Sequence, residues 1–102
     1  MRSANVFNYG IHAGVLTELS DGSYVFEYAE NYDGPPISLT MPIRNNHFEY
    51  KKFPPFFDGL LPEGMMLSAL LKAEKLDSDD YFGQLIVVGN DLVGSVTVRA
   101  NK

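Results

Sequence analysis

The chain has 102 residues, of which 45% are hydrophobic and 21% are charged, and its formal net charge at pH 7 is -5. This length fits one domain with one modest core, so we expect residues 1–102 to form a single domain. The absence of cysteine excludes disulfides, thiolate metal ligands and cysteine nucleophiles. The acidic excess and the scattered basic residues argue against direct nucleic-acid binding. No apolar run could span a bilayer and no signal-peptide core is present, which predicts a cytoplasmic protein without membrane contact.

The first half of the chain has the pattern of short antiparallel strands. Strands are predicted near residues 4–8, 12–19 and 23–28. Gly10 lies in the first connection, and Asp21-Gly22 between apolar runs is a strong hairpin signal in the second. We therefore expect two tight hairpins in succession.

The middle of the chain alternates between loop and strand signals. Asn, Asp, Gly and Pro dominate residues 29–36 and predict a loop. Residues 37–41 alternate apolar and polar side chains, which predicts a half-buried strand ended by Pro42. Residues 44–52 are polar with isolated aromatics, and we interpret them as a loop that allows a short extended stretch over 48–50.

The second half changes to a helical period. Pro54-Pro55 is typical of a helix start, because proline is tolerated in the first turn. A second, amphipathic helix is predicted from residue 63 to about 75, and a Pro-Glu-Gly turn separates it from the first. Its predicted apolar face consists of Met66, Ala69, Leu70 and Ala73.

A third helix is predicted after a run of capping residues. Asp77, Asp79 and Asp80 precede an apolar run from Tyr81, as N-caps and first-turn carboxylates do. The end of this helix is ambiguous, because residues 86–88 are β-branched whereas Gly89 suits a C-cap. Residues 94–100 alternate like a last strand. The expected fold class is α+β: a small antiparallel sheet or partial barrel with two or three helices packed at one side.

The side chains that usually carry catalysis or metal binding are not arranged for it. His12 and His47 are far apart in sequence and lack metal-site spacing, and the carboxylates near Asp79 are explained by helix capping rather than by a cation. Residues 10–14 contain glycine but match no phosphate-binding pattern, and no hydrolase or kinase catalytic motif occurs. We therefore expect no metal, no cofactor and no enzymatic activity.

One segment carries a specific resemblance. Residues 56–64, Phe-Phe-Asp-Gly-Leu-Leu-Pro-Glu-Gly, resemble the F-F-D-N-L-L-P-E-G motif of the N-terminal domain of HipA-type serine/threonine kinases, with Gly59 at the frequent Asn. Residues 39–43, 79–89 and 94–96 are similar to the S-L-S-L-P-L, D-D-x-F…x-V-G and G-A-V segments of that family. The likeness spans about residues 6–98. In HipA proteins the kinase core follows this module, so we expect the catalytic part to be absent here.

A free-standing copy of this module resembles the HipS antitoxins of three-part HipB, HipS and HipT systems. The resemblance implies the antitoxin of a type II toxin–antitoxin system, which binds and inhibits a HipT-like serine/threonine kinase. It also implies a HipB-like DNA-binding protein as a second partner through a ternary complex. Two alternatives stay open: a non-inhibitory scaffold or regulatory subunit of a HipA-like kinase, or an excised N-terminal fragment of a longer HipA kinase.

The partner contact is expected at the start of the second predicted helix. Met65 falls beside the polar arc of that helix, so its flexible thioether should project outward and suit a partner pocket. The alternative interpretation is structural: Phe57 and its apolar neighbours form core, and the Pro-Glu-Gly turn only joins two helices. The expected partner-binding residues are Phe57, Asp58, Pro62, Glu63, Gly64 and Met65.

Overall fold

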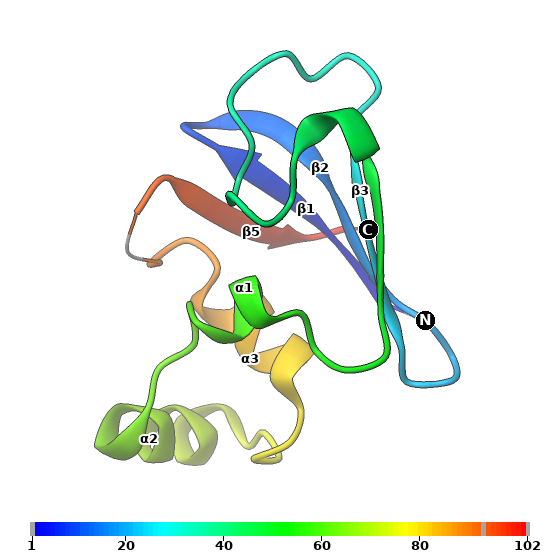
Figure 1. Cartoon of the computed structure of the whole chain (residues 1–102). Helices are drawn as coiled ribbons and strands as arrows, with labels where there is room; N and C mark the ends of the chain where they lie inside the picture. The colour runs from blue at the N-terminus through cyan, green and yellow to red at the C-terminus, as the bar shows by residue number, and fades with distance from the viewer. Residues whose placement is uncertain (1, 93, 102) are drawn as a thin grey trace.

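The structure, a computed structural model that describes residues 2–92 and 94–101, is an antiparallel sheet with helices gathered on one side (Figure 1). The strands are β1 (Arg2–Asn8), β2 (Ile11–Glu18), β3 (Tyr24–Tyr28), β4 (His47–Tyr50) and β5 (Val96–Ala100), in the spatial order β4-β3-β2-β1-β5. A 3-10 turn, η1 (Ile43–Asn45), precedes β4, and the helices are α1 (Pro55–Asp58), α2 (Gly64–Glu74) and α3 (Tyr81–Val88). The predicted α+β class is confirmed, and the sheet does not close into a barrel.

The first three strands form the two predicted hairpins. β1 pairs with β2 through a tight connection at Gly10, and β2 pairs with β3 around Asp21-Gly22. β4 extends the sheet beside β3, so the short extended stretch expected near residues 48–50 is a strand. β5 returns beside β1, with Ala4 opposite Ala100, as the predicted closing strand requires.

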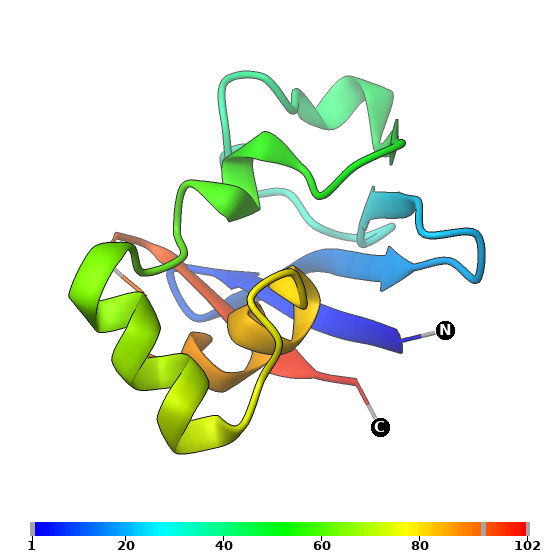
Figure 2. The same cartoon turned by 90° about the horizontal axis from the view of Figure 1, so that it is seen from below.

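The core lies between the sheet and the helices (Figure 2). Phe57 of α1 is fully buried, and its ring centroid lies 5.9 Å from that of Phe26 on β3. α3 adds Phe82 and Leu85, which are also buried. Burying one such side chain contributes about 1.5–3 kcal/mol, so these contacts fix α1 and α3 against the sheet.

The predicted strand at residues 37–41 is wrong. The Met41 N–H donates to the carbonyl oxygen of Ser38 at 3.0 Å, which closes a turn instead. The Tyr28 hydroxyl accepts from the Ile37 N–H at 3.0 Å and donates to the Met41 carbonyl at 2.6 Å. Ile37 and Met41 are therefore buried while Leu39, which a strand would place with them, is 97% exposed.

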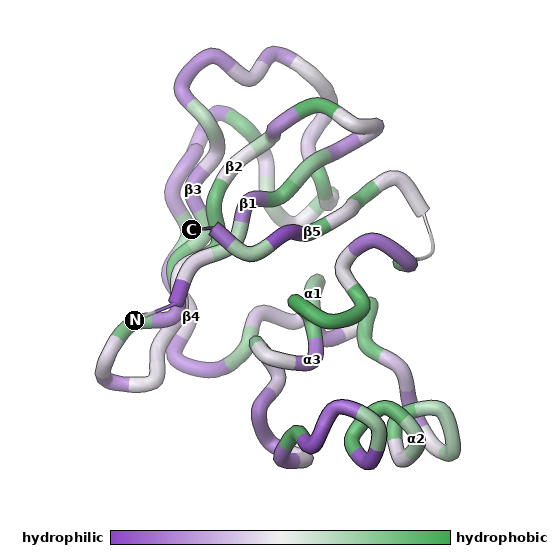
Figure 3. Tube along the Cα trace, turned by 180° about the vertical axis from the view of Figure 1, so that it is seen from behind, coloured by the Kyte–Doolittle hydropathy of each residue, from purple (hydrophilic) through white to green (hydrophobic). Residues whose placement is uncertain are grey.

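The helix α2 is confirmed, but of its predicted apolar face only Leu70 lies on the side that packs. None of its residues is buried, Met66 is 74% exposed, and Ala69 and Ala73 are exposed. The half-buried side is formed by Leu67, Leu70 and Leu71. Figure 3 shows apolar segments along α2 at the margin of the molecule. Gly64, the first residue of α2, has a φ of 60°, which glycine adopts readily, and the two methionines that follow it are exposed.

The structure confirms the predicted start of α3 and decides its end, which the sequence left ambiguous. The Asp80 side chain accepts from the Gly83 N–H at 3.0 Å, so the predicted N-cap is present. The helix continues through Val88 and ends at Gly89, whose carbonyl accepts from the Val98 N–H of β5 at 2.9 Å. Among the helices of residues 2–92 and 94–101, none has the length and apolar character needed to cross a membrane.

Candidate protein-binding site

The segment that joins α1 to α2 leaves the core as a hydrogen-bonded turn. Pro55 occupies the first turn of α1, and the Gly59 N–H donates to its carbonyl at 3.0 Å. The next two amides, of Leu60 and Leu61, donate to the carbonyls of Phe57 and Asp58 at 3.0 and 3.2 Å. The buried Phe57 thus anchors a short turn whose far side faces solvent.

Five of the six expected partner-binding residues offer surface, and one does not. Met65 is 90% exposed, as its position predicts, while Phe57 has no exposed surface and serves the core. Asp58, Glu63 and Gly64 are exposed, and Pro62 is half-buried. The turn therefore combines a core function with an exposed edge at its α2 end, and its partner-binding role stays a prediction.

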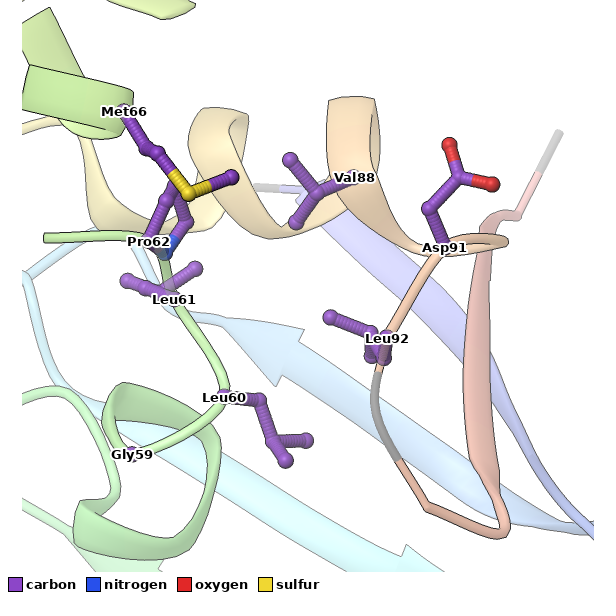
Figure 4. A pocket seen from close by; sticks show the side chains of 8 residues that line it. All are labelled: Gly59, Leu60, Leu61, Pro62, Met66, Val88, Asp91 and Leu92. Carbon is purple, nitrogen blue, oxygen red and sulfur yellow. The ribbon is translucent and has the colours of Figure 1, made fainter.

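The same turn forms a ridge between two hollows. The larger, of about 390 Å³, lies between the turn and the end of α3 (Figure 4), and we call it the α3 groove. It is lined by Gly59, Leu60, Leu61, Pro62, Met66, Val88, Asp91 and Leu92. The smaller hollow, of about 140 Å³, is lined by Asp58, Leu61, Pro62, Glu63, Leu67, Tyr81 and Gln84. Leu61 and Pro62 line both, so they separate the two hollows.

α2 lies at the margin of the fold and exposes apolar side chains. The helix stands outside the sheet and α3 in both views of the ribbon (Figures 1 and 2). Its N-cap residue, Glu63, makes no capping side-chain hydrogen bond. An isolated helix of 11 residues is marginal in water, and most helix stability comes from packing of an apolar face. α2 therefore presents unpacked apolar surface that a partner could cover.

The charged side chains that line the two hollows are all acidic. Asp58, Glu63 and Asp91 contribute carboxylates, and no Lys or Arg in the described part of the chain lines either hollow. Residues 2–92 and 94–101 hold no group of three His, Cys, Asp or Glu side chains placed to bind a metal. His12 and His47 each contact a different neighbour, Asn5 and Glu49, both at 3.0 Å. The arrangement suits binding of an apolar, cationic partner.

Sequence reasoning did not find the wall of the α3 groove formed by Val88, Asp91 and Leu92. These residues lie about 30 positions after the turn, and only the packing of α3 against the sheet brings them beside it. One signal was present, because Tyr81, Gln84 and Val88 follow helical spacing on one face of α3. That face runs along both hollows.

Comparison with known proteins gives a consistent result. The sequence model of the family described as "HipA N-terminal domain" matches residues 4–99. The solved "N-terminal domain of HipA toxin" superposes with a TM-score of 0.80 at 31% identity, covering 100% of this chain and 94% of that one. An uncharacterized protein of Haemophilus influenzae is 33% identical over 102 residues, which is 100% of this chain and 95% of the relative.

Longer proteins contain a similar segment. A protein of Sinorhizobium fredii named "Putative kinase Y4dM" is 32% identical over 104 residues, and "Putative kinase Y4mE" of the same organism is 29% identical over 100 residues. The matches cover 92% and 94% of this chain but only 25% and 24% of those proteins. The chain thus spans about a quarter of the length of these two relatives.

Proposed function

Because the chain belongs to the HipA N-terminal domain family, we propose that it is a non-catalytic antitoxin that binds and inhibits a HipT-like serine/threonine kinase. The observation that carries this proposal is the family match over residues 4–99, since this domain is a subdomain of HipA proteins rather than their catalytic part. The chain acts by occupying a surface of the kinase. It performs no phosphoryl transfer itself.

The exposed edge from Pro62 to Met65 supports a binding role. Exposed apolar clusters are typical of protein interfaces, and a few buried anchor residues dominate interface energies. Met65 is unbranched and polarizable, so it adapts to an irregular pocket. We propose that this edge, with Asp58 beside it, contacts the kinase, while Phe57 supports the edge from the core.

A second partner follows from the same proposal. In a three-part toxin–antitoxin system the chain joins a HipB-like DNA-binding protein through a ternary complex with the kinase. The acidic character of the chain supports this indirect route, because a net charge of -5 repels the phosphate backbone. Neither direct nucleic-acid contact nor membrane contact forms part of the proposed activity.

The test is a phosphorylation assay with a purified HipT-like kinase from the organism that encodes this chain. Adding the purified chain should abolish phosphorylation of the kinase's substrate, and co-expression should restore growth of cells that carry the kinase. No change in either readout would contradict the proposed function.

Met65→Asp tests the proposed edge. The variant should bind the kinase about tenfold more weakly, which corresponds to about 1.4 kcal/mol, because it places a charge where an apolar contact is expected. Leu39→Asp is the matched control, since Leu39 is as exposed as Met65 but lies in the loop that precedes η1. Equal inhibition by wild type and Met65→Asp would remove Met65 from the interface.

One observation favours a second candidate function. In each of the two Sinorhizobium proteins named as kinases, a similar segment makes up about a quarter of a longer chain. A regulatory subunit that supports a HipA-like kinase without inhibiting it would fit this arrangement. The phosphorylation assay separates the two functions, because an antitoxin lowers the phosphorylation of the substrate whereas a supporting subunit leaves it unchanged or raises it. An excised fragment of a longer HipA kinase would be recognised by a reading frame that continues past Lys102 into kinase motifs.

A further inference from the structure

We propose that the α3 groove is a second contact subsite for the kinase, which receives one large apolar side chain of the kinase and, beside it, a Lys or Arg that pairs with Asp91. This inference rests on the proposed function, because the occupant is the same kinase. It adds a location and a partner chemistry that the Met65 edge does not specify.

The lining of the groove defines the apolar part of the occupant. Leu60 and Pro62 of the turn, Met66 of α2, Val88 of α3 and Leu92 of the following loop converge on it (Figure 4). Its volume of about 390 Å³ is at the small end of the roughly 300–1,000 Å³ typical of ligand pockets. A single large side chain fits this space better than a folded segment does.

The charge at the rim defines the rest of the occupant. Asp91 is exposed, and its carboxylate makes no hydrogen bond or ion pair with any residue in 2–92 or 94–101. No described Lys or Arg lines the groove or the neighbouring hollow, where Asp58 and Glu63 add two further carboxylates. A cation next to the apolar anchor therefore completes the site, whereas an acidic or phosphorylated segment would be repelled.

The groove continues into the proposed edge, so one partner can occupy both. Pro62 lines the groove and begins the edge, and Met66, which lines the groove, directly follows Met65. Met65 is exposed and the groove beside it is hollow, so the proposed interface has one side chain that this chain inserts and one that it receives. Reciprocal insertion of this kind places buried anchors on both partners.

Asp91→Lys is the decisive variant, because an exposed position tolerates the change without loss of the fold. We expect it to raise the Kd for the purified HipT-like kinase about tenfold at 50 mM salt. The ratio of the two Kd values, variant over wild type, should fall at 500 mM salt, because screening weakens the repulsion between the new lysine and the kinase cation. Asp33→Lys makes the same charge change at an exposed position of the loop between β3 and η1, and should bind within twofold of wild type.

Val88→Glu tests the apolar part of the groove. It should raise the Kd at least tenfold, and its thermal unfolding curve checks that α3 remains folded. If Asp91→Lys binds as tightly as wild type, the groove inference is overturned while the proposed function stands. If the wild-type chain itself does not bind the kinase, both are overturned.

Discussion

At the residue scale, Asp80 connects the start of α3 to the sheet. Its Oδ1 accepts from the Gly83 N–H at 3.0 Å and from Nη2 of Arg2 at 2.8 Å. Arg2 also donates through Nε to Glu18 of β2 at 2.7 Å, and its guanidinium lies 5.1 Å from the centroid of the Phe82 ring. The hydrogen bond from Arg2, followed by that from Gly83, holds the pKa of Asp80 below its ordinary value.

Replacing Asp80 by Ala should lower the free energy of unfolding by about 1–2 kcal/mol at pH 7. Loss of an N-cap costs about 1 kcal/mol, and an exposed ion pair adds up to about 1 kcal/mol. Asp80→Asn is the matched control, because asparagine keeps the capping acceptor but lacks the charge. It should cost less than about 1 kcal/mol, as measured by urea unfolding.

The pH dependence of this pair of variants follows from the lowered pKa of Asp80. The charged form is favoured in the folded state, so its contribution is complete above the unfolded pKa of about 3.9. It is lost as the pH falls through the lower, folded pKa. The stability difference between wild type and Asp80→Asn should therefore vanish in strong acid. A difference that does not shrink as the pH falls below the unfolded pKa would contradict this assignment.

At the element scale, the end of α3 touches β5 through backbone atoms. A Cβ added at Gly89 would lie 1.9 Å from the carbonyl oxygen of Val98, whose own N–H bonds to Gly89. Real atoms do not approach this closely, so glycine is required here by contact rather than by φ. This approach brings the end of α3, and with it the α3 groove, beside the 59–62 turn.

Gly89→Ala should destabilise the protein by at least about 1–3 kcal/mol, because the backbone of α3 must move away from β5. It should also weaken kinase binding by displacing Val88 and Asp91. Gly59→Ala is the control: its φ is -65° and the added Cβ would be 3.5 Å from its neighbours, an ordinary contact. Thermal unfolding should show a large shift for Gly89→Ala and almost none for Gly59→Ala, and equal shifts would refute this explanation.

At the scale of the whole molecule, the negative net charge predicts that the chain acts on DNA only through a partner. With a net charge of -5 and a sequence pI near 4.8, the chain opposes binding to the DNA phosphates, because basic side chains supply most of the affinity for DNA. The purified chain should not retard duplex DNA in a gel at about 50 mM salt. Adding the chain to DNA-bound HipB-like protein should increase the retardation only when the kinase is also present. A shift caused by the chain alone would contradict the proposed partner route.

The sequence alone determined the secondary structure where local signals agree with the final packing. Turn chemistry at Asp21-Gly22, the two prolines at the start of α1 and the Asp80 cap act within a few residues, so the first two hairpins, the helix starts and the fold class were predictable from them. The nine-residue motif at 56–64 determined the family in the same way. The spacing of apolar residues on α2 also predicted an exposed Met65, which is confirmed, although Met66 on the predicted apolar face is exposed as well.

Only the tertiary structure decided how apolar residues are shared between core and surface. At residues 37–41 the Tyr28 hydroxyl, from another strand, holds a turn that alternation alone interprets as a strand. On α2 the side that packs is decided by where the helix lies against the rest of the fold, so Leu67 and Leu71 are half-buried while Met66 is exposed. The α3 groove likewise requires Gly89 to meet β5. Each of these outcomes depends on contacts between residues far apart in the chain, and local pattern carries no information about such contacts.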